Sequence, residues 1–126
     1  MSEQPSRFKD LVNDAKRRIA EVTADQVRER LDRGDRIQLV DVREESEWLQ
    51  GRAAGAVHLS KGVIERDIEK RFPETDTELI LYCGGGSRSA LAADNLRKMG
   101  YSEVYSLIGG FKTWRDSGLP LDTGPA

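Results

Sequence analysis

The chain has 126 residues, which is the usual size of one domain and too short for two comfortable ones. Hydrophobic residues make up 37% of it, enough for a buried core, while 20 Lys and Arg nearly balance 22 Asp and Glu and leave a formal net charge of -2. This balance gives no reason to expect nucleic acid or an anionic membrane as a partner.

The sequence also limits the compartment and the kinds of site. No stretch is long and apolar enough for a membrane helix, and the first 20 residues lack the apolar run of a signal peptide. Cys83 is the only cysteine, so no internal disulfide can form, and no cluster of His and Cys could hold a metal. We therefore expect a cytoplasmic protein in a reducing environment, without a metal site.

The first predicted element is a helix with one apolar side. Apolar residues recur at steps of three and four at Phe8, Leu11, Val12, Ala15 and Ile19. This spacing predicts an amphipathic helix from about Pro5 to Ala20. Its basic side is interpreted as solvent-exposed, with a membrane surface or a partner as the alternative, and residues 1–21 are treated as an N-terminal helical extension.

The next helix has the clearest boundary. Thr23 and Gln26 match a capping box, and Val22 and Val27 are placed as a hydrophobic staple, so a helix begins here and ends at Gly34. Strands and helices then alternate. Further strands are predicted over 37–42, 56–59, 79–83 and 104–107, and further helices over 44–50, 61–72, 87–99 and 110–117. We expect one domain over 22–120 and a loose C-terminal tail over 121–126.

The strand predicted over 79–83 indicates the fold class. Its residues are apolar throughout rather than alternating, as expected for a strand covered on both faces in a parallel sheet. Short parallel strands joined by crossover helices form an α/β fold. We expect a small parallel sheet of four or five strands with helices on both faces, in addition to the N-terminal helix.

The most informative segment runs from Cys83 to Ser89, between this strand and the next helix. Ligands bind at the carboxyl ends of strands in such sheets, because the helix N-termini there present free N–H groups. Three successive glycines let the backbone adopt left-handed conformations and turn several N–H groups toward one point. These donors and the helix dipole would lower the pKa of Cys83 below the ~8.5 of a free cysteine.

A structural alternative is that Cys83 is a small buried hydrophobic residue followed by an ordinary turn. Three glycines cost backbone entropy without filling any volume, which argues against it. Four residues separate Cys83 from Arg88, whereas cysteine-dependent phosphatases and arsenate reductases use five to surround a tetrahedral phosphate. The tighter loop suits the terminal sulfur of a cysteine persulfide and favours sulfur chemistry.

From about Thr23 to Leu119 the sequence resembles the single-domain members of the rhodanese family, the thiosulfate and related sulfurtransferases. The resemblance is carried by Asp41-Val42-Arg43-Glu44, Gly51 to Leu59, Cys83 to Ser89, and Gly109-Gly110-Phe111 with Trp114. Two positions depart from the family pattern. Arg52 stands where the family commonly has His, and Ala54 where it often has Pro; both concern local geometry rather than chemistry.

This resemblance implies a doubly wound α/β fold and a ping-pong sulfurtransferase with Cys83 as the nucleophile. Cys83 would take sulfane sulfur from a donor such as thiosulfate or a persulfide and pass it to a sulfur-accepting thiol or protein. No cofactor is expected beyond the transient cysteine persulfide. The expected persulfide cradle consists of Gly84, Gly85, Gly86, Ser87 and Arg88.

Supporting roles are expected for Ser89, Asp41, Arg43, Glu44 and His58. Asp41 and Arg43 are interpreted as a structural pair at a strand end. His58, the only histidine, is assigned to backbone support, with a Cys-His dyad as the alternative.

Two questions stay open at the level of sequence. Arg88 either faces the pocket and attracts an anionic donor, or pairs with Asp41 or Glu44 and braces the loop. Two other functions are also compatible with the residues: a non-catalytic interaction module that docks a partner, and a cysteine-dependent phosphatase or arsenate reductase. The phosphatase or reductase function is weakened by the loop spacing and by the lack of a second cysteine.

Overall fold

A five-stranded parallel sheet forms the centre of the computed structural model, which describes residues 6–123. Its strands are β1 (Ala20–Val22), β2 (Gln38–Asp41), β4 (Val57–His58), β5 (Leu79–Tyr82) and β6 (Val104–Leu107), in the order β1-β6-β5-β2-β4. The helices are α1 (Arg7–Lys16), α2 (Ala24–Asp32), α3 (Glu45–Gln50), α4 (Ile64–Arg71), α5 (Ser87–Lys98) and α6 (Gly110–Asp116). A separate antiparallel pair joins β3 (Arg52–Ala53) to β7 (Leu121–Asp122).

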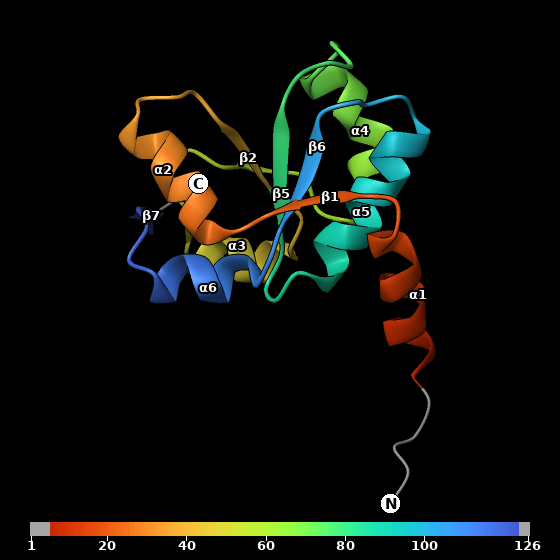
Figure 1. Ribbon diagram of the computed structural model, residues 1–126, viewed down its shortest axis with the longest axis horizontal. Coiled ribbons are helices and arrows are strands. Elements are labelled where there is room, and N and C mark those ends of the chain that lie inside the picture. The colour runs from red at the N-terminus through yellow and green to blue at the C-terminus, as the bar shows by residue number, and fades with distance from the viewer. Residues whose placement is uncertain (1–5, 124–126) are drawn as a thin grey trace, which may run out of the picture.

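Helices cover both faces of the parallel sheet. In Figure 1, α1, α4 and α5 lie on one side of the strands, and α2 and α6 lie on the other. The central strand β5 divides its side chains between these layers: Leu79 and Leu81 pack with α4 and α5, while Ile80 and Tyr82 pack with α2 and α6. The predicted fold class is therefore confirmed, including the central strand with two buried faces.

One strand of the sheet was not predicted. The helix expected to reach Ala20 ends at Lys16, and Ala20–Val22 form the edge strand β1, parallel to β6. Three residues are too few to show a strand periodicity, and their hydrogen-bonding partner lies far along the chain. Thr23 caps α2 immediately afterwards, with the predicted capping box in place.

The prediction of a loose tail over 121–126 is wrong for its first two residues. Leu121 pairs with Ala53, and Asp122 pairs with Arg52. The N–H of Ala54 extends this ladder by donating to the carbonyl of Pro120 at 3.0 Å. A proline at position 54, common in the family, could not donate this bond, so this departure fits the antiparallel pair. The rest of the predicted tail, 124–126, lies outside the described residues.

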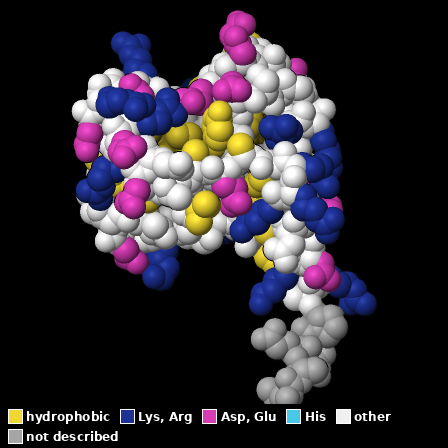
Figure 2. All heavy atoms as spheres, in the orientation of Figure 1, with side chains coloured by type: hydrophobic (Ala, Val, Ile, Leu, Met, Phe, Trp, Pro, Cys, Tyr) yellow, Lys and Arg dark blue, Asp and Glu magenta, His cyan; other side chains and the backbone are white. Residues whose placement is uncertain are grey.

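Ion pairs join the N-terminal helix to the domain. Figure 2 shows Lys and Arg side chains gathered over α1 and α5. Arg18, just after α1, donates to both carboxylate oxygens of Asp94 on α5, at 2.9 and 2.8 Å, and Lys98 lies 3.5 Å from the same carboxylate. Part of the basic side predicted to face solvent therefore contacts α5. None of the helices described between residues 6 and 123 has the length and apolar character to span a bilayer.

Candidate active site

The thiol of Cys83 lies at the carboxyl end of β5 and is almost completely buried. Its Sγ accepts the backbone N–H of Gly86 at 3.1 Å and that of Ser89 at 3.4 Å. The hydroxyl of Ser89 lies 3.6 Å from the same sulfur. The first turn of α5 and the loop before it thus place several polar hydrogens around one sulfur atom.

These contacts determine the ionisation of the thiol. Burial by itself raises the pKa of Cys83, because a thiolate loses solvation. Hydrogen bonds from the Ser89 side chain and from the N–H groups of Ser89, Gly86 and Gly85 oppose this effect, and the net pKa lies below the ordinary thiol value. The arrangement therefore favours ionisation of this buried thiol without a neighbouring base.

The three glycines of the loop have different roles. Only Gly86 has a left-handed conformation, with φ of 105°, whereas left-handed freedom was expected along the whole run. A Cβ at position 84 would lie 3.1 Å from the guanidinium of Arg88, and one at position 85 would meet nothing. Gly86 precedes α5 directly, so its conformation turns the chain from the loop into the helix.

Helix α6 packs its amino end against the back of this loop. The N–H of Phe111 donates to the carbonyl of Cys83 at 2.7 Å, and that of Lys112 donates to the carbonyl of Gly84 at 3.2 Å. In a trans peptide the carbonyl and the following N–H point in opposite directions. Because these two carbonyls point toward α6, the N–H groups of residues 84 and 85 point away from it.

Gly110 makes this close approach feasible. Its φ is 59°, and a Cβ there would lie 2.4 Å from the carbonyl oxygen of Cys83. The Gly109-Gly110-Phe111 motif carried part of the family resemblance, but the contact between these glycines and the cysteine loop was not predicted. The motif was visible in the sequence, whereas the approach of two distant segments was not.

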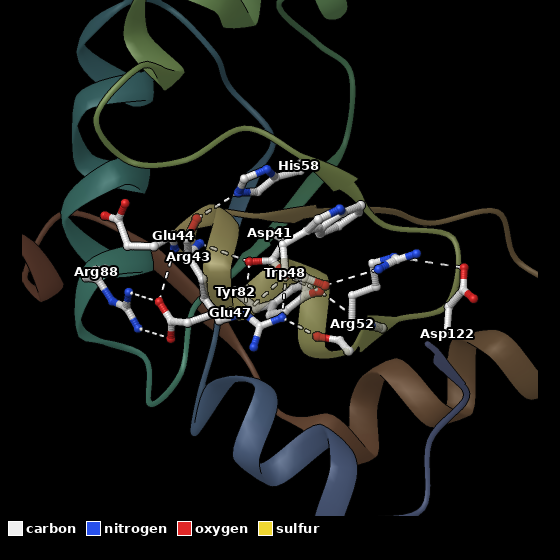
Figure 3. A network of polar contacts seen from close by, with 12 residues as sticks. Asp41, Arg43, Glu44, Glu47, Trp48, Arg52, His58, Tyr82, Arg88 and Asp122 are labelled. Atoms are coloured by element: carbon white, nitrogen blue, oxygen red, sulfur yellow. Dashed lines mark hydrogen bonds and ion pairs between the residues drawn. The ribbon is translucent and has the colours of Figure 1, made fainter. Parts of the chain in front are cut away.

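Arg88 braces the loop through a partner that was not predicted. Its guanidinium donates to both oxygens of Glu47, at 2.7 and 3.1 Å, and not to Asp41 or Glu44 (Figure 3). Glu47 also accepts the N–H of Glu44, the N-cap of α3, at 3.1 Å. The hydrogen bonds from Arg88, opposed by burial, lower the pKa of Glu47 to about 2. Glu47 follows Glu44 at capping-box spacing, a sequence signal for this carboxylate.

At the end of β2, Asp41 and Arg43 form the expected pair within a larger buried network (Figure 3). Arg43 donates to Asp41 at 2.8 Å through Nη2 and at 3.0 Å through Nε, and its Nη2 also donates to the carbonyl of Gly51. The hydroxyl of Tyr82 donates to Asp41 at 2.8 Å and accepts the N–H of Ala53. Burial and the Asp41 charge raise the pKa of Tyr82, so the phenol stays protonated and keeps donating.

His58 lies within the same region but contacts the backbone. Its Nε2 is 2.8 Å from the carbonyl of Arg43, and its ring stacks on Trp48 with centroids 5.0 Å apart. These contacts fit the expected supporting role. Arg52, the second departure from the family pattern, is buried with its guanidinium 4.6 Å from the Trp48 ring, and its Nε lies 4.0 Å from Asp122 (Figure 3).

A buried hydroxyl beneath the loop was missed at the sequence level. Ser106 of β6 lies with its Oγ 2.8 Å from the Oγ of Ser89, and both residues are fully buried. The strand Val104–Leu107 was predicted, but nothing in its sequence indicated that one of its side chains reaches the site. Ser87 begins α5 and completes the turn between Gly86 and Arg88.

Comparisons with known proteins place this geometry in context. The family model described as Rhodanese-like domain matches residues 23–117. The chain is 37% identical over 79 residues to thiosulfate sulfurtransferase GlpE of Coxiella burnetii, covering 63% of this chain and 72% of that protein. It is 34% identical over 112 residues to GlpE of Pseudomonas paraeruginosa, covering 89% of this chain and 94% of that protein.

A solved structure from Rhodopseudomonas palustris has a similar fold. It is 30% identical to this chain, superposes with a TM-score of 0.80, and covers 97% of this chain and 99% of its own. That protein is described as of unknown function and a possible tyrosine phosphatase. The similarity therefore extends over nearly the whole described chain, including the segments before and after the family match.

Proposed function

The chain belongs to the rhodanese-like domain family, and we propose that it is a sulfurtransferase that carries sulfane sulfur as a persulfide on Cys83. The observation that supports this most directly is the surroundings of Sγ, which accepts N–H groups from Gly86 and Ser89 at 3.1 and 3.4 Å. Donors without a formal charge can stabilise an anionic sulfur and still let sulfur arrive and leave.

In the first half-reaction the Cys83 thiolate attacks the sulfane sulfur of a donor. With thiosulfate, a new S–S bond forms to Sγ, the S–S bond within thiosulfate breaks, and its electron pair leaves on sulfite. The cysteine then carries a persulfide. The residues from Gly84 to Arg88 form the cradle around the terminal sulfur, where backbone N–H groups stabilise its negative charge.

In the second half-reaction an acceptor nucleophile attacks the terminal sulfur. A bond from the acceptor to that sulfur forms, the Cys83 S–S bond breaks, and the electron pair returns to Sγ as the thiolate. The acceptor is a thiophilic small molecule, a thiol or a protein. No general acid is needed at either step, because sulfite and the thiolate leave as stabilised anions.

The relatives support thiosulfate as a donor, since both GlpE proteins are named thiosulfate sulfurtransferases. We further propose that the protein works in the cytoplasm. A reducing environment there would keep its lone cysteine available for a transient persulfide.

The name of the Rhodopseudomonas palustris protein favours a second candidate, a cysteine-dependent phosphatase. Such an enzyme needs an arginine free to bind phosphate. In this chain both terminal nitrogens of Arg88 donate to the Glu47 carboxylate, and the loop has four residues between Cys83 and Arg88. These two features make sulfur transfer the better-supported activity.

Intact-mass spectrometry tests the proposal. After incubation with thiosulfate, or separately with a low-molecular-weight persulfide, the protein is expected to gain one sulfur atom that cyanide removes as thiocyanate. The Cys83→Ser variant should gain none. If the folded protein keeps its mass with every sulfane donor, the sulfurtransferase proposal is wrong, and phosphate-ester hydrolysis that depends on Cys83 would favour the phosphatase.

The pH dependence of alkylation tests the state of the nucleophile. Because the pKa of Cys83 lies below the ordinary thiol value, its reaction with iodoacetamide should reach half of its maximal rate at a lower pH in the folded protein than in the unfolded one. The unfolded protein in urea provides the reference. A midpoint that is equal or higher in the folded protein would contradict a stabilised thiolate.

A further inference from the structure

The buried hydroxyl of Ser106 lies one step behind the site. Ser106 faces the same side of the sheet as Val104, which packs in the apolar cluster that also contains Cys83. Its Oγ is 2.8 Å from the Oγ of Ser89, whose hydroxyl is in turn 3.6 Å from the sulfur of Cys83. Two fully buried hydroxyls thus form a short chain from β6 to the nucleophile.

The charge on the Cys83 sulfur determines which hydroxyl donates and which accepts in these two hydrogen bonds. A neutral thiol can donate its own proton to Ser89, which is then free to donate to Ser106. A thiolate can only accept, so Ser89 must turn its single proton toward the sulfur. The oxygen of Ser89 is then left as an acceptor for the proton of Ser106. Both arrangements need only rotation about C–O bonds.

We propose that Ser106 is a positioning residue that acts through Ser89, donating to its oxygen so that the Ser89 proton points at the ionised sulfur of Cys83. Hydrogen bonds in such a chain polarise each other, which strengthens the bond that reaches the charge. This role rests on the proposed function and extends it, because the thiolate is the species that accepts sulfur.

The charged groups near the Ser106 and Ser89 hydroxyls already have partners. Arg88 on α5 interacts with the ionised Cys83 and is held by Glu47 of α3. On β1, Glu21 lies beside Ser106 in the sheet register and pairs with Lys16. Charged groups on α4 and at the end of β2 have partners of their own: Glu65 accepts from Asn95, and Asp41 pairs with Arg43.

The test is the pH profile of Cys83 alkylation by iodoacetamide in the folded protein. Ser106→Ala should move the midpoint upward by about half a pH unit, which is about threefold less thiolate at any pH below both midpoints. Ser102→Ala is the matched control, because Ser102 is an exposed serine just before β6 whose hydroxyl donates to the carbonyl of Thr75. Ser102→Ala should leave the profile unchanged.

A double-mutant cycle tests the route of the effect. If Ser106 acts through Ser89, Ser106→Ala should cause no further shift in a Ser89→Ala background. An equal shift in both backgrounds would overturn the proposal, as would an unchanged profile in Ser106→Ala alone.

A second pair of variants keeps the test decisive if Ser106→Ala does not fold. Ser106→Thr and Ser106→Val have nearly the same shape, and only the threonine retains the hydroxyl. The threonine variant should keep the wild-type midpoint and the valine variant should raise it; equal midpoints would contradict the proposal. Alkylation needs no sulfur donor. The role of Ser106 can therefore be judged from the alkylation midpoints even if the intact-mass experiment shows no sulfur transfer.

Discussion

The adjacent ends of β5 and β2 stabilise charge in opposite ways, although Tyr82 and Asp41 are register partners. At the end of β2, the negative Asp41 and the positive Arg43 are both buried and neutralise each other. At the end of β5, the hydrogen bonds to the sulfur of Cys83 come from N–H groups and a hydroxyl without formal charge, and Arg88, a cation that also interacts with the thiolate, is itself paired with Glu47.

This difference follows from when each charge is present. Asp41 and Arg43 take no part in the proposed reaction, so each can keep the other as a direct counter-charge throughout it. In the proposed reaction the charge on the sulfur appears, moves to a second sulfur and returns. Fixed dipoles serve all of these states, whereas a tightly paired cation would favour one of them. The side chain of Tyr82 belongs to the first region, and its backbone leads directly into the second.

The largest effect should come from breaking the network at β2. Asp41→Ala leaves Arg43 buried without its counter-charge and is expected to lower the free energy of unfolding by about 3–5 kcal/mol, measured by urea denaturation. Asp67→Ala is the control, because its pair with Arg66 involves an arginine that is 73% exposed. That variant should lose far less unfolding free energy than Asp41→Ala, because solvent screens an exposed pair. Similar losses in the two variants would mean that the buried Asp41–Arg43 pair contributes no more to stability than an exposed pair.

The second effect separates the position of the loop from overall stability. Gly110→Ala places a Cβ against the carbonyl of Cys83 and should displace the loop. A displacement of this kind is expected to reduce the rate of sulfur transfer by about a hundredfold, measured with thiosulfate and cyanide. Gly118→Ala is the matched control, because Gly118 also has a positive φ, of 73°, but its Cβ would meet nothing. Equal losses of rate in both variants would mean that backbone strain alone is responsible.

The smallest effect should come from the partly exposed pair that braces the loop. Glu47→Gln removes the charge that Arg88 contacts, and after allowance for solvent screening it should cost about 1 kcal/mol of unfolding free energy at neutral pH. Because folding lowers the pKa of Glu47 from 4.5 to about 2, its contribution is complete above 4.5 and is lost as the pH falls toward 2.

The difference in unfolding free energy between wild type and Glu47→Gln should therefore shrink over that acid range. Glu45→Gln is the control, since Glu45 is an exposed residue in the same first turn of α3. A difference between wild type and Glu47→Gln that stays constant from neutral pH to pH 2 would show that the charge of Glu47 does not brace the loop.

Most of the fold could be predicted because its signals are local. Each signal spans only a few consecutive residues. Examples are the apolar run of β5, the capping box at Thr23 and Gln26, and the glycines that follow helices. The missed elements are short and depend on distant partners. Ala20–Val22 is a strand because β6 lies beside it, and Leu121–Asp122 is one because Arg52–Ala53 is available to pair.

The candidate site divides in the same way. The sequence alone determined where the lone cysteine stands, between an apolar strand and a helix, and how many residues separate it from Arg88, because both are properties of neighbouring residues. Only the tertiary structure decided that Arg88 pairs with Glu47, that α6 holds the loop carbonyls, and that Ser106 lies beneath Ser89. Hydrogen bonds depend on distance and direction in space, and packing brings these partners together from separate elements.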